Sequence, residues 1–252
     1  MMHVYEGGNI FGDGDIAKEY VAGVVKHVQR DLPIGIKAIP DIGSAGYKVA
    51  SGDMDLFIDA GALMQKFRVA DDKAAKQALE TFMQAKGYPT KISGRNVHIE
   101  VPYKTPEGIR KVQVDLMVIA DADVVAPWHQ HGPRGMYDQP NFKASHNFIL
   151  MNSIAKHLGL KFDAFAAKLM RRDDNTVVAR TRDEVAKILL GQAAKADDLN
   201  SVASMVTALK NDPDKDSKLA QARQDAAKGL ISMPESVQEG SANWFRKYSS
   251  LL

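Results

Sequence analysis

Two acidic residues share the polar side of a short alternating segment, and this pattern constrains the fold more than any other part of the chain. The segment Asp-Met-Asp-Leu-Phe-Ile-Asp begins at Asp53 and places Met54, Leu56 and Ile58 at alternate positions. Alternate side chains of a strand share one face, so these three residues point to a core. Asp53 and Asp55 then point together to the other face, where two carboxylates repel each other unless a cation lies between them. The pattern indicates a strand that holds Mg²⁺.

A glycine-serine turn precedes this strand. Gly43 and Ser44 stand about ten residues before Asp53, and Ser51 and Gly52 come directly before it. Such residues are also common in turns without any function. An ordinary polar turn that leads into an edge strand is therefore the alternative interpretation.

A second alternating segment, residues 111–119, carries a third acid. Four apolar residues alternate there with polar positions, one of which is Asp115. If this strand lies beside the first, Asp115 joins Asp53 and Asp55. Three carboxylates are the hard oxygen ligands that Mg²⁺ or Mn²⁺ prefers, and such a cluster can hold two ions roughly 3.5–4 Å apart for in-line phosphoryl transfer. The alternative for Asp115 is an edge-strand acid that faces water.

Together these segments resemble the nucleotidyltransferase superfamily of the DNA polymerase β type, typified by the family X polymerases. Gly43-Ser44 is similar to the family's glycine-serine turn, the Asp53-Met54-Asp55 run to its paired metal ligands, and Asp115 to its third aspartate. The resemblance implies that Ser44 and nearby backbone amides hold the β and γ phosphates. It also implies that the paired aspartates bind both metals, while Asp115 binds the catalytic metal and takes the proton of the primer hydroxyl.

The chain departs from the family after the glycine-serine pair. The family usually has arginines there, whereas this chain has Ala-Gly-Tyr followed by Lys48, which is the candidate replacement for the phosphate-binding arginine. Residues 141–161 resemble the family's thumb, with Ser145 where the serine of a Gly-Ser pair is usual and Asn141 where an aromatic residue often packs against the sugar. The choice between ribo- and deoxyribonucleotides therefore stays open. The nucleotide-binding residues expected from the resemblance are Gly43, Ser44, Lys48, Gly52, Phe142 and Ser145.

Aromatic and histidine residues have simpler alternative roles. Phe142 either contacts the nucleotide or packs in the core, and the sequence does not choose between them, whereas core packing is favoured for Phe148. His129 and His131 are spaced like metal ligands, but they lie in a proline-rich segment, where a packing or surface role is favoured. Thr181 begins a short helix pattern with acidic residues in its first turn, similar to the helix that closes the family's thumb.

Composition places the chain among globular proteins. Hydrophobic residues make up 45% and charged residues 25%, and there is no cysteine. Neither a basic segment followed by an apolar run at the start nor a stretch of about 18 apolar residues is present. We therefore expect a cytoplasmic protein with no membrane partner, and small enzymes of this kind occur in bacterial and phage genomes. The net charge is +2, but basic residues outnumber acidic ones by 18 to 12 in residues 61–180, which suits either a nucleic-acid backbone or a solvated face.

The order of elements predicts an α+β protein with the polymerase β-like nucleotidyltransferase fold. We expect a helix at 15–29 capped by Asp15, strands at 34–40 and 53–58, a helix capped by Asp59, a helix at 72–86, a hairpin at 90–101 and a strand at 111–119. These elements give a small mixed sheet with helices on one face, followed by a mainly helical C-terminal part. The expected divisions are a catalytic domain at 1–125, an irregular linker at 120–143, a thumb-like subdomain at 140–192 and a helical extension of unknown role at 193–252. Only 42 residues precede Gly43, so we expect a reduced palm-and-thumb unit.

Three functions follow from these observations. The leading hypothesis is Mg²⁺-dependent transfer of a nucleoside monophosphate from a (d)NTP to the 3′ end of DNA or RNA. The second keeps this chemistry but uses a protein or small molecule as the acceptor, which the nearly neutral net charge permits. The third is a catalytically silent nucleotide-binding protein, against which the intact set of three aspartates argues.

Overall fold

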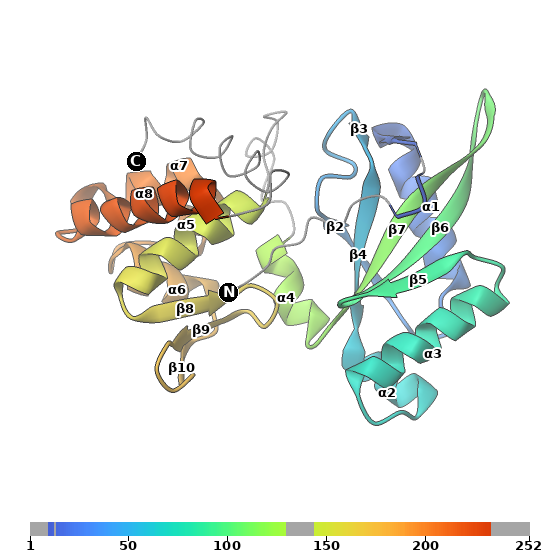
Figure 1. The fold of residues 1–252 in the computed structure, drawn as a ribbon, viewed down its shortest axis with the longest axis horizontal. Coiled ribbons are helices and arrows are strands. Elements are labelled where there is room, and N and C mark those ends of the chain that lie inside the picture. Colours follow the sequence, from blue (N-terminus) through green and yellow to red (C-terminus); the bar gives the residue numbers. More distant parts are fainter. Residues whose placement is uncertain (1–9, 13, 130–143, 233–252) are drawn as a thin grey trace. The chain divides into compact units, whose positions relative to one another are not determined.

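The computed structural model describes residues 10–12, 14–129 and 144–232, without the side chains of residues 144–146 and 225–232. The chain divides into two compact units, residues 1–131 and 132–252, which are described separately below (Figure 1). Their boundary falls inside the segment 120–143 that the sequence predicts as a linker. No helix in the described ranges has the length and apolar character needed to cross a bilayer.

The first unit contains a mixed sheet and four helices. Its elements, in chain order, are β1 (Ile16–Ala17), α1 (Lys18–Asp31), β2 (Ala38–Ile42), β3 (Ala50–Ser51), β4 (Asp53–Asp59), α2 (Ala60–Phe67), α3 (Asp72–Ala85), β5 (Thr90–Ser93), β6 (Asn96–Thr105), β7 (Gly108–Ile119) and α4 (Ala122–His129).

Five strands form the main sheet, in the order β2-β4-β7-β6-β5 (Figure 1). Strands β4 and β7 are parallel, whereas the other neighbouring pairs are antiparallel. The α+β class, the mixed sheet and the hairpin of β5 and β6 predicted from the sequence are thus confirmed. The two strands that carry the aspartates are direct neighbours, with Asp55 opposite Asp115 and Asp53 opposite Gln113.

The hydrophobic core lies on the face of the sheet that carries Met54, Leu56 and Ile58. Helices α1, α2 and α3 pack there, and Leu63 and Leu79 are fully buried in the same cluster. The opposite face carries the aspartates, because successive side chains of a strand alternate between faces. The expectation that all helices cover one face is wrong for α4, which contacts β2, β4 and β7. On that opposite face, the ring of His129 from α4 lies edge-on to Phe57 of β4, with their centroids 5.0 Å apart.

Helix α1 starts later than the sequence suggests. Asp15 is not its cap: the residue before the helix is Ala17, which makes no side-chain cap. The reason is a tertiary one, because Ile16 and Ala17 pair with Ala50 and Ser51 as strands β1 and β3. This pairing is non-local, so the helix pattern alone does not reveal it.

The segment after β7 is helical where an irregular linker was expected. Helix α4 includes Pro127, which has no backbone N–H to donate within the helix. Val125 and Trp128 of this helix are buried, so tertiary packing outweighs the local cost of the proline. His129 is also buried, so of the packing and surface roles that the sequence favours it has the packing role, and His131 lies outside the described residues.

Asp59 joins three elements at the end of β4. Its Oδ1 accepts a hydrogen bond of 2.7 Å from the amide of Ala62 and caps α2, as predicted. Its Oδ2 accepts a second bond of 3.1 Å from the amide of Ala122 at the start of α4. One side chain therefore fixes the ends of both helices that follow the two aspartate-bearing strands.

The second unit combines helices with a small sheet that the sequence analysis missed. Its elements, in chain order, are α5 (Ala144–His157), β8 (Leu160–Asp163), β9 (Lys168–Arg171), β10 (Val177–Ala179), α6 (Arg182–Leu190), η1 (Ala196–Asn200), α7 (Val202–Ala208), η2 (Leu209–Asn211) and α8 (Lys215–Ser232).

Strands β8, β9 and β10 form a three-stranded antiparallel sheet. Phe148 of α5 stacks on Phe162 of β8 with centroids 6.0 Å apart, which confirms its packing role. The predicted acidic-capped helix is also confirmed, since Thr181 and Glu184 form a capping box at the start of α6. Helix α8 packs on α5, so the thumb-like segment and the C-terminal extension lie in one unit.

The double role of Asp59 gives a test of the fold. Asp59→Ala removes a helix cap and the bond to Ala122, so we expect it to lower the free energy of unfolding by about 2 kcal/mol. Asp71→Ala is the matched control, because Asp71 caps only α3 through the amide of Ala74 and should cost about 1 kcal/mol. Urea unfolding of both variants measures the difference, and equal losses would contradict the joining role.

Candidate functional site

The predicted metal ligands lie on two adjacent parallel strands. Asp55 on β4 and Asp115 on β7 are register partners, and Asp53 is two residues from Asp55 on the same face. Directly opposed residues in neighbouring strands bring their side chains close together. The structure thus places the three aspartates in one patch of the sheet, as the sequence predicts.

Gly43 lies directly against Asp55. Its φ is +74°, and a Cβ atom at this position would lie 2.2 Å from Oδ2 of Asp55. No side chain fits in that space, and the left-handed backbone also favours glycine. The glycine-serine turn therefore lies so close to the carboxylate that only glycine fits at position 43.

The residues around the turn differ in what they contribute. Ser44 Oγ lies 3.3 Å from Ser51 Oγ, so the two serines link the turn to the strand β3 that precedes Asp53. The amide of Lys48 donates to the carbonyl of Ser44 at 3.2 Å and closes the turn. Gly52 has room for a side chain, since a Cβ there would meet only Asp15 Oδ1 at 3.5 Å, an ordinary contact.

The surroundings of Asp55 disfavour its ionised form. Its pKa is raised well above the usual carboxyl value, first by burial, then by the charge of Asp53 and then by that of Asp115. Like charges and a poorly solvated site disfavour the ionised form of Asp55, whereas a bound cation would favour it. The arrangement thus has the electrostatic character of a cation site.

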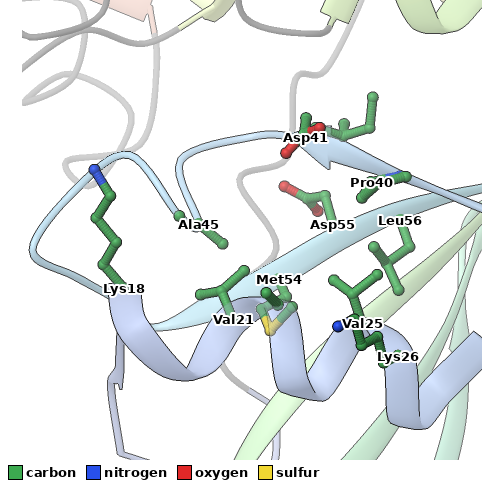
Figure 2. A pocket seen from close by; sticks show the side chains of 13 residues that line it. Lys18, Val21, Val25, Lys26, Pro40, Asp41, Ala45, Met54, Asp55 and Leu56 are labelled. Atoms are coloured by element: carbon green, nitrogen blue, oxygen red, sulfur yellow. The ribbon is translucent and has the colours of Figure 1, made fainter.

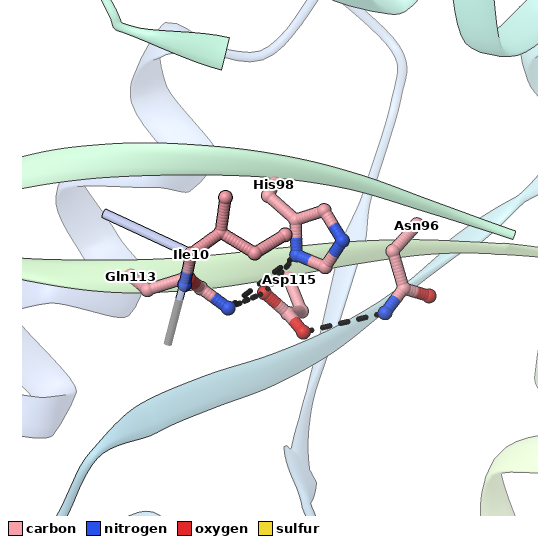
Figure 3. A network of polar contacts seen from close by, with 5 residues as sticks. All are labelled: Ile10, Asn96, His98, Gln113 and Asp115. Carbon is pink, nitrogen blue, oxygen red and sulfur yellow. Dashed lines mark hydrogen bonds and ion pairs between the residues drawn. The ribbon is translucent and has the colours of Figure 1, made fainter. Parts of the chain in front are cut away.

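Asp115 is held by three side chains on its own strand and on β6 (Figure 3). Its Oδ1 accepts hydrogen bonds from His98 Nδ1 at 2.7 Å and from Gln113 Nε2 at 2.8 Å. Its Oδ2 accepts a longer one, 3.3 Å, from Asn96 Nδ2. Gln113 is fixed in turn, since its Oε1 accepts from the amide of Ile10 at 2.6 Å.

A cavity of about 380 Å³ adjoins Asp55, between α1 and the turn (Figure 2). Asp41 and Asp55 lie across it from α1, which contributes Lys18 and Lys26. Lys48, the cation expected from the sequence, is not among the described residues that line it. The helical spacing could have predicted that Lys18 and Lys26 lie together, because residues 18, 22 and 26 follow one another at four-residue intervals on one side of α1.

The donor set suits a divalent cation, although its side chains are not yet gathered. Carboxylate oxygens from neighbouring strands on one patch of the sheet fit Mg²⁺ or Mn²⁺ chemistry. Even so, no three Asp, Glu or His side chains within the described ranges form a ready group that could hold a metal ion. Binding would therefore require the carboxylates of Asp53, Asp55 and Asp115 to turn toward a common point.

Two expected nucleotide-binding residues are not tested by the structure. Phe142 lies outside the described residues, and so does the side chain of Ser145, although its backbone belongs to the first turn of α5. Both belong to the second unit, whereas the aspartates and the turn belong to the first. The sequence analysis also missed His98, Asn96 and Gln113.

Comparison with known proteins adds no assignment. A scan against protein-family models finds no match to this chain, and a search of curated proteins finds no significant match either.

The contact of Gly43 with Asp55 predicts that a side chain at position 43 destabilises the fold. Gly43→Ala must place a Cβ on the carboxylate and also strain the backbone, whereas Gly87→Ala only strains it, since φ is +91° there and nothing lies within 4 Å. The backbone strain alone should cost about 1–2 kcal/mol. We expect Gly43→Ala to lose more than Gly87→Ala in urea unfolding. Equal losses would show that the turn does not press on Asp55.

The raised pKa of Asp55 predicts that the stability of the folded protein depends on pH. Because the folded protein favours the protonated carboxyl, its stabilising contribution is present below the unfolded pKa, about 3.9, and is lost as pH rises toward the folded value. Asp55→Asn removes this loss of stability, because the asparagine side chain does not ionise. In EDTA the melting temperature of Asp55→Asn should exceed that of wild type by a few degrees at pH 8, with the difference shrinking toward pH 4.

The control for this titration is Asp41→Asn, which removes an exposed carboxylate from the same cavity. It measures how much of the gain at pH 8 comes from removing any one negative charge at this cavity. A gain from Asp55→Asn that did not change with pH would contradict the electrostatic account.

Proposed function

We propose that the chain is a divalent-metal-dependent nucleotidyltransferase with a polymerase β-like catalytic unit. The observation that carries this proposal is the parallel register of β4 and β7, which sets Asp55 beside Asp115 with Gly43 against the Asp55 carboxylate. The raised pKa of Asp55 supports the proposal as well. The polymerase β-like fold is itself part of the proposal, since the structure gives the coarser class of a mixed α+β unit.

In the proposed reaction, a hydroxyl oxygen of the acceptor attacks the α-phosphorus of a nucleoside triphosphate. The new P–O bond forms as the bond to pyrophosphate breaks, and the hydroxyl proton is released to water. Two Mg²⁺ ions, when bound by Asp53, Asp55 and Asp115, would supply charge neutralisation and a lowered pKa of the attacking hydroxyl. The amides and hydroxyl of the turn at Gly43 and Ser44 would hold the phosphates.

Positive charge near the site comes from α1. Lys18 and Lys26 line the cavity beside Asp55, so they, rather than Lys48 alone, are candidates to neutralise the triphosphate. The cavity also offers an apolar surface from Val21, Val25 and Met54. This combination of a mainly apolar wall with few charged groups is typical of small-molecule sites.

A nucleic acid is the favoured acceptor. The exposed basic residues of the first unit include Lys66, Arg68, Lys86, Lys91, Arg95, Lys104, Arg110 and Lys111. Exposed cations of this kind bind a phosphate backbone with an affinity that falls steeply with salt. Binding of a labelled oligonucleotide that weakens with salt supports this acceptor, whereas no binding at any salt favours a protein or small-molecule acceptor.

Loss of Asp115 is the decisive test of the proposed chemistry. Asp115→Ala should lower Mg²⁺-dependent incorporation of labelled nucleotide by roughly 100-fold or more while the protein stays folded. Asp72→Ala is the control, because Asp72 is an exposed acid at the start of α3 and should leave incorporation unchanged. Equal activity of wild type and Asp115→Ala would contradict the proposal.

A further inference from the structure

Strand β6 presents two polar side chains to Asp115. Asn96 and His98 occupy alternate positions of this strand, while Val97 and Ile99 between and beyond them are fully buried in the core cluster. His98 is the direct register partner of Asp115, and both side chains are only 2% exposed. The aspartate patch of the sheet thus continues as a polar stripe onto a strand that carries no predicted metal ligand.

The two carboxylate oxygens of Asp115 differ in the hydrogen bonds that they accept. Each carboxylate oxygen has two acceptor positions. Oδ1 fills both, with His98 Nδ1 at 2.7 Å and Gln113 Nε2 at 2.8 Å. Within the described residues, Oδ2 has one bond, the longer one of 3.3 Å from Asn96. One acceptor position, on Oδ2, therefore remains among the contacts of the described residues.

The same contacts set the hydrogen-bonding state of His98. An ionised carboxylate only accepts hydrogen bonds, so we assign the proton of the short contact to Nδ1 of His98. Nε2 of His98 is then a buried atom with no hydrogen-bond partner in the described part of the chain, and Oδ1 of Asn96 is another. Leaving such atoms unpaired costs about 1–3 kcal/mol each. Side chains that served only to fill the core would avoid this cost, so the polar stripe points to a role beyond packing.

We propose that His98 is a positioning residue for Asp115. Its Nδ1–H and the amide of Gln113 hold Oδ1, so that Asp115 presents Oδ2 as the one oxygen available to a divalent cation. Asn96 steadies the same oxygen through its longer contact. This inference rests on the proposed function, because it assumes that Asp115 is a metal ligand.

Outer hydrogen bonds of this kind orient metal ligands, and their loss typically lowers metal affinity by roughly 10–100-fold. His98→Phe keeps a ring of similar size but removes the donor to Asp115. We expect it to weaken Mn²⁺ binding, measured by calorimetry without turnover, by at least roughly tenfold. Its kcat should fall, while its KM for the acceptor changes little.

Two polar variants separate positioning from packing. In His98→Asn the side-chain amide nitrogen lies near the place of Nδ1, so this variant should restore Mn²⁺ affinity to near wild type. In His98→Gln the amide nitrogen lies near the place of Nε2, so affinity should stay low. Unchanged affinity in His98→Phe, or equal affinity in His98→Asn and His98→Gln, would overturn the proposal. The Asn and Gln pair decides the matter if His98→Phe does not fold.

A spectroscopic measurement tests the geometry without any metal. Long-range ¹H–¹⁵N correlation of the imidazole should show His98 with its proton on Nδ1 in wild type, and a proton found on Nε2 alone would overturn the proposal. The two failures are distinguishable. If wild type binds neither Mn²⁺ nor nucleotide, the proposed function fails, whereas a wild type that binds both but tolerates His98→Phe contradicts only the role of His98.

Discussion

The parallel pairing of β4 with β7 is the interaction on which the rest of the structure depends. It sets Asp55 opposite Asp115, and it gives both strands a common apolar face that α1, α2 and α3 cover. The same pairing brings the ends of the two strands together, where Asp59 caps α2 and also holds the start of α4. Since a shift of one residue would turn every side chain to the other face, the buried face fixes the position of the aspartates.

The surroundings of Asp55 and of Asp115 differ. Burial and two neighbouring acids disfavour the ionised Asp55, and Gly43 leaves no space beside it for a side chain. Asp115 is in a different situation, since three side chains donate hydrogen bonds to its carboxylate. The ionised form of one aspartate is therefore disfavoured while another aspartate is held in place, and a cation bound between them would favour both charges.

Local sequence patterns predicted much of the fold, whereas the features that were not predicted depend on contacts between residues distant in the sequence. The alternation around Asp53 and Asp115, the cap at Asp59 and the capping box of Thr181 and Glu184 depend on neighbouring residues, and all four were visible in the sequence. Asp15 lost its predicted role because a distant segment pairs with the residues after it. The sheet of β8, β9 and β10 was missed, and α4 forms despite Pro127 because its apolar residues are buried. His98 was missed for the same reason, since only the register of β6 with β7 brings it to Asp115.

Calorimetric titration of the metal-free protein with Mn²⁺ in the presence of a non-hydrolysable nucleoside triphosphate tests the central claim most directly. If Asp53, Asp55 and Asp115 form one site, wild type binds two ions and the nucleotide, and the affinity of each ligand rises when the other is present. Replacement of any one of the three aspartates by Asn should abolish this mutual effect. Binding that is absent in wild type, or that survives all three substitutions, would contradict the account.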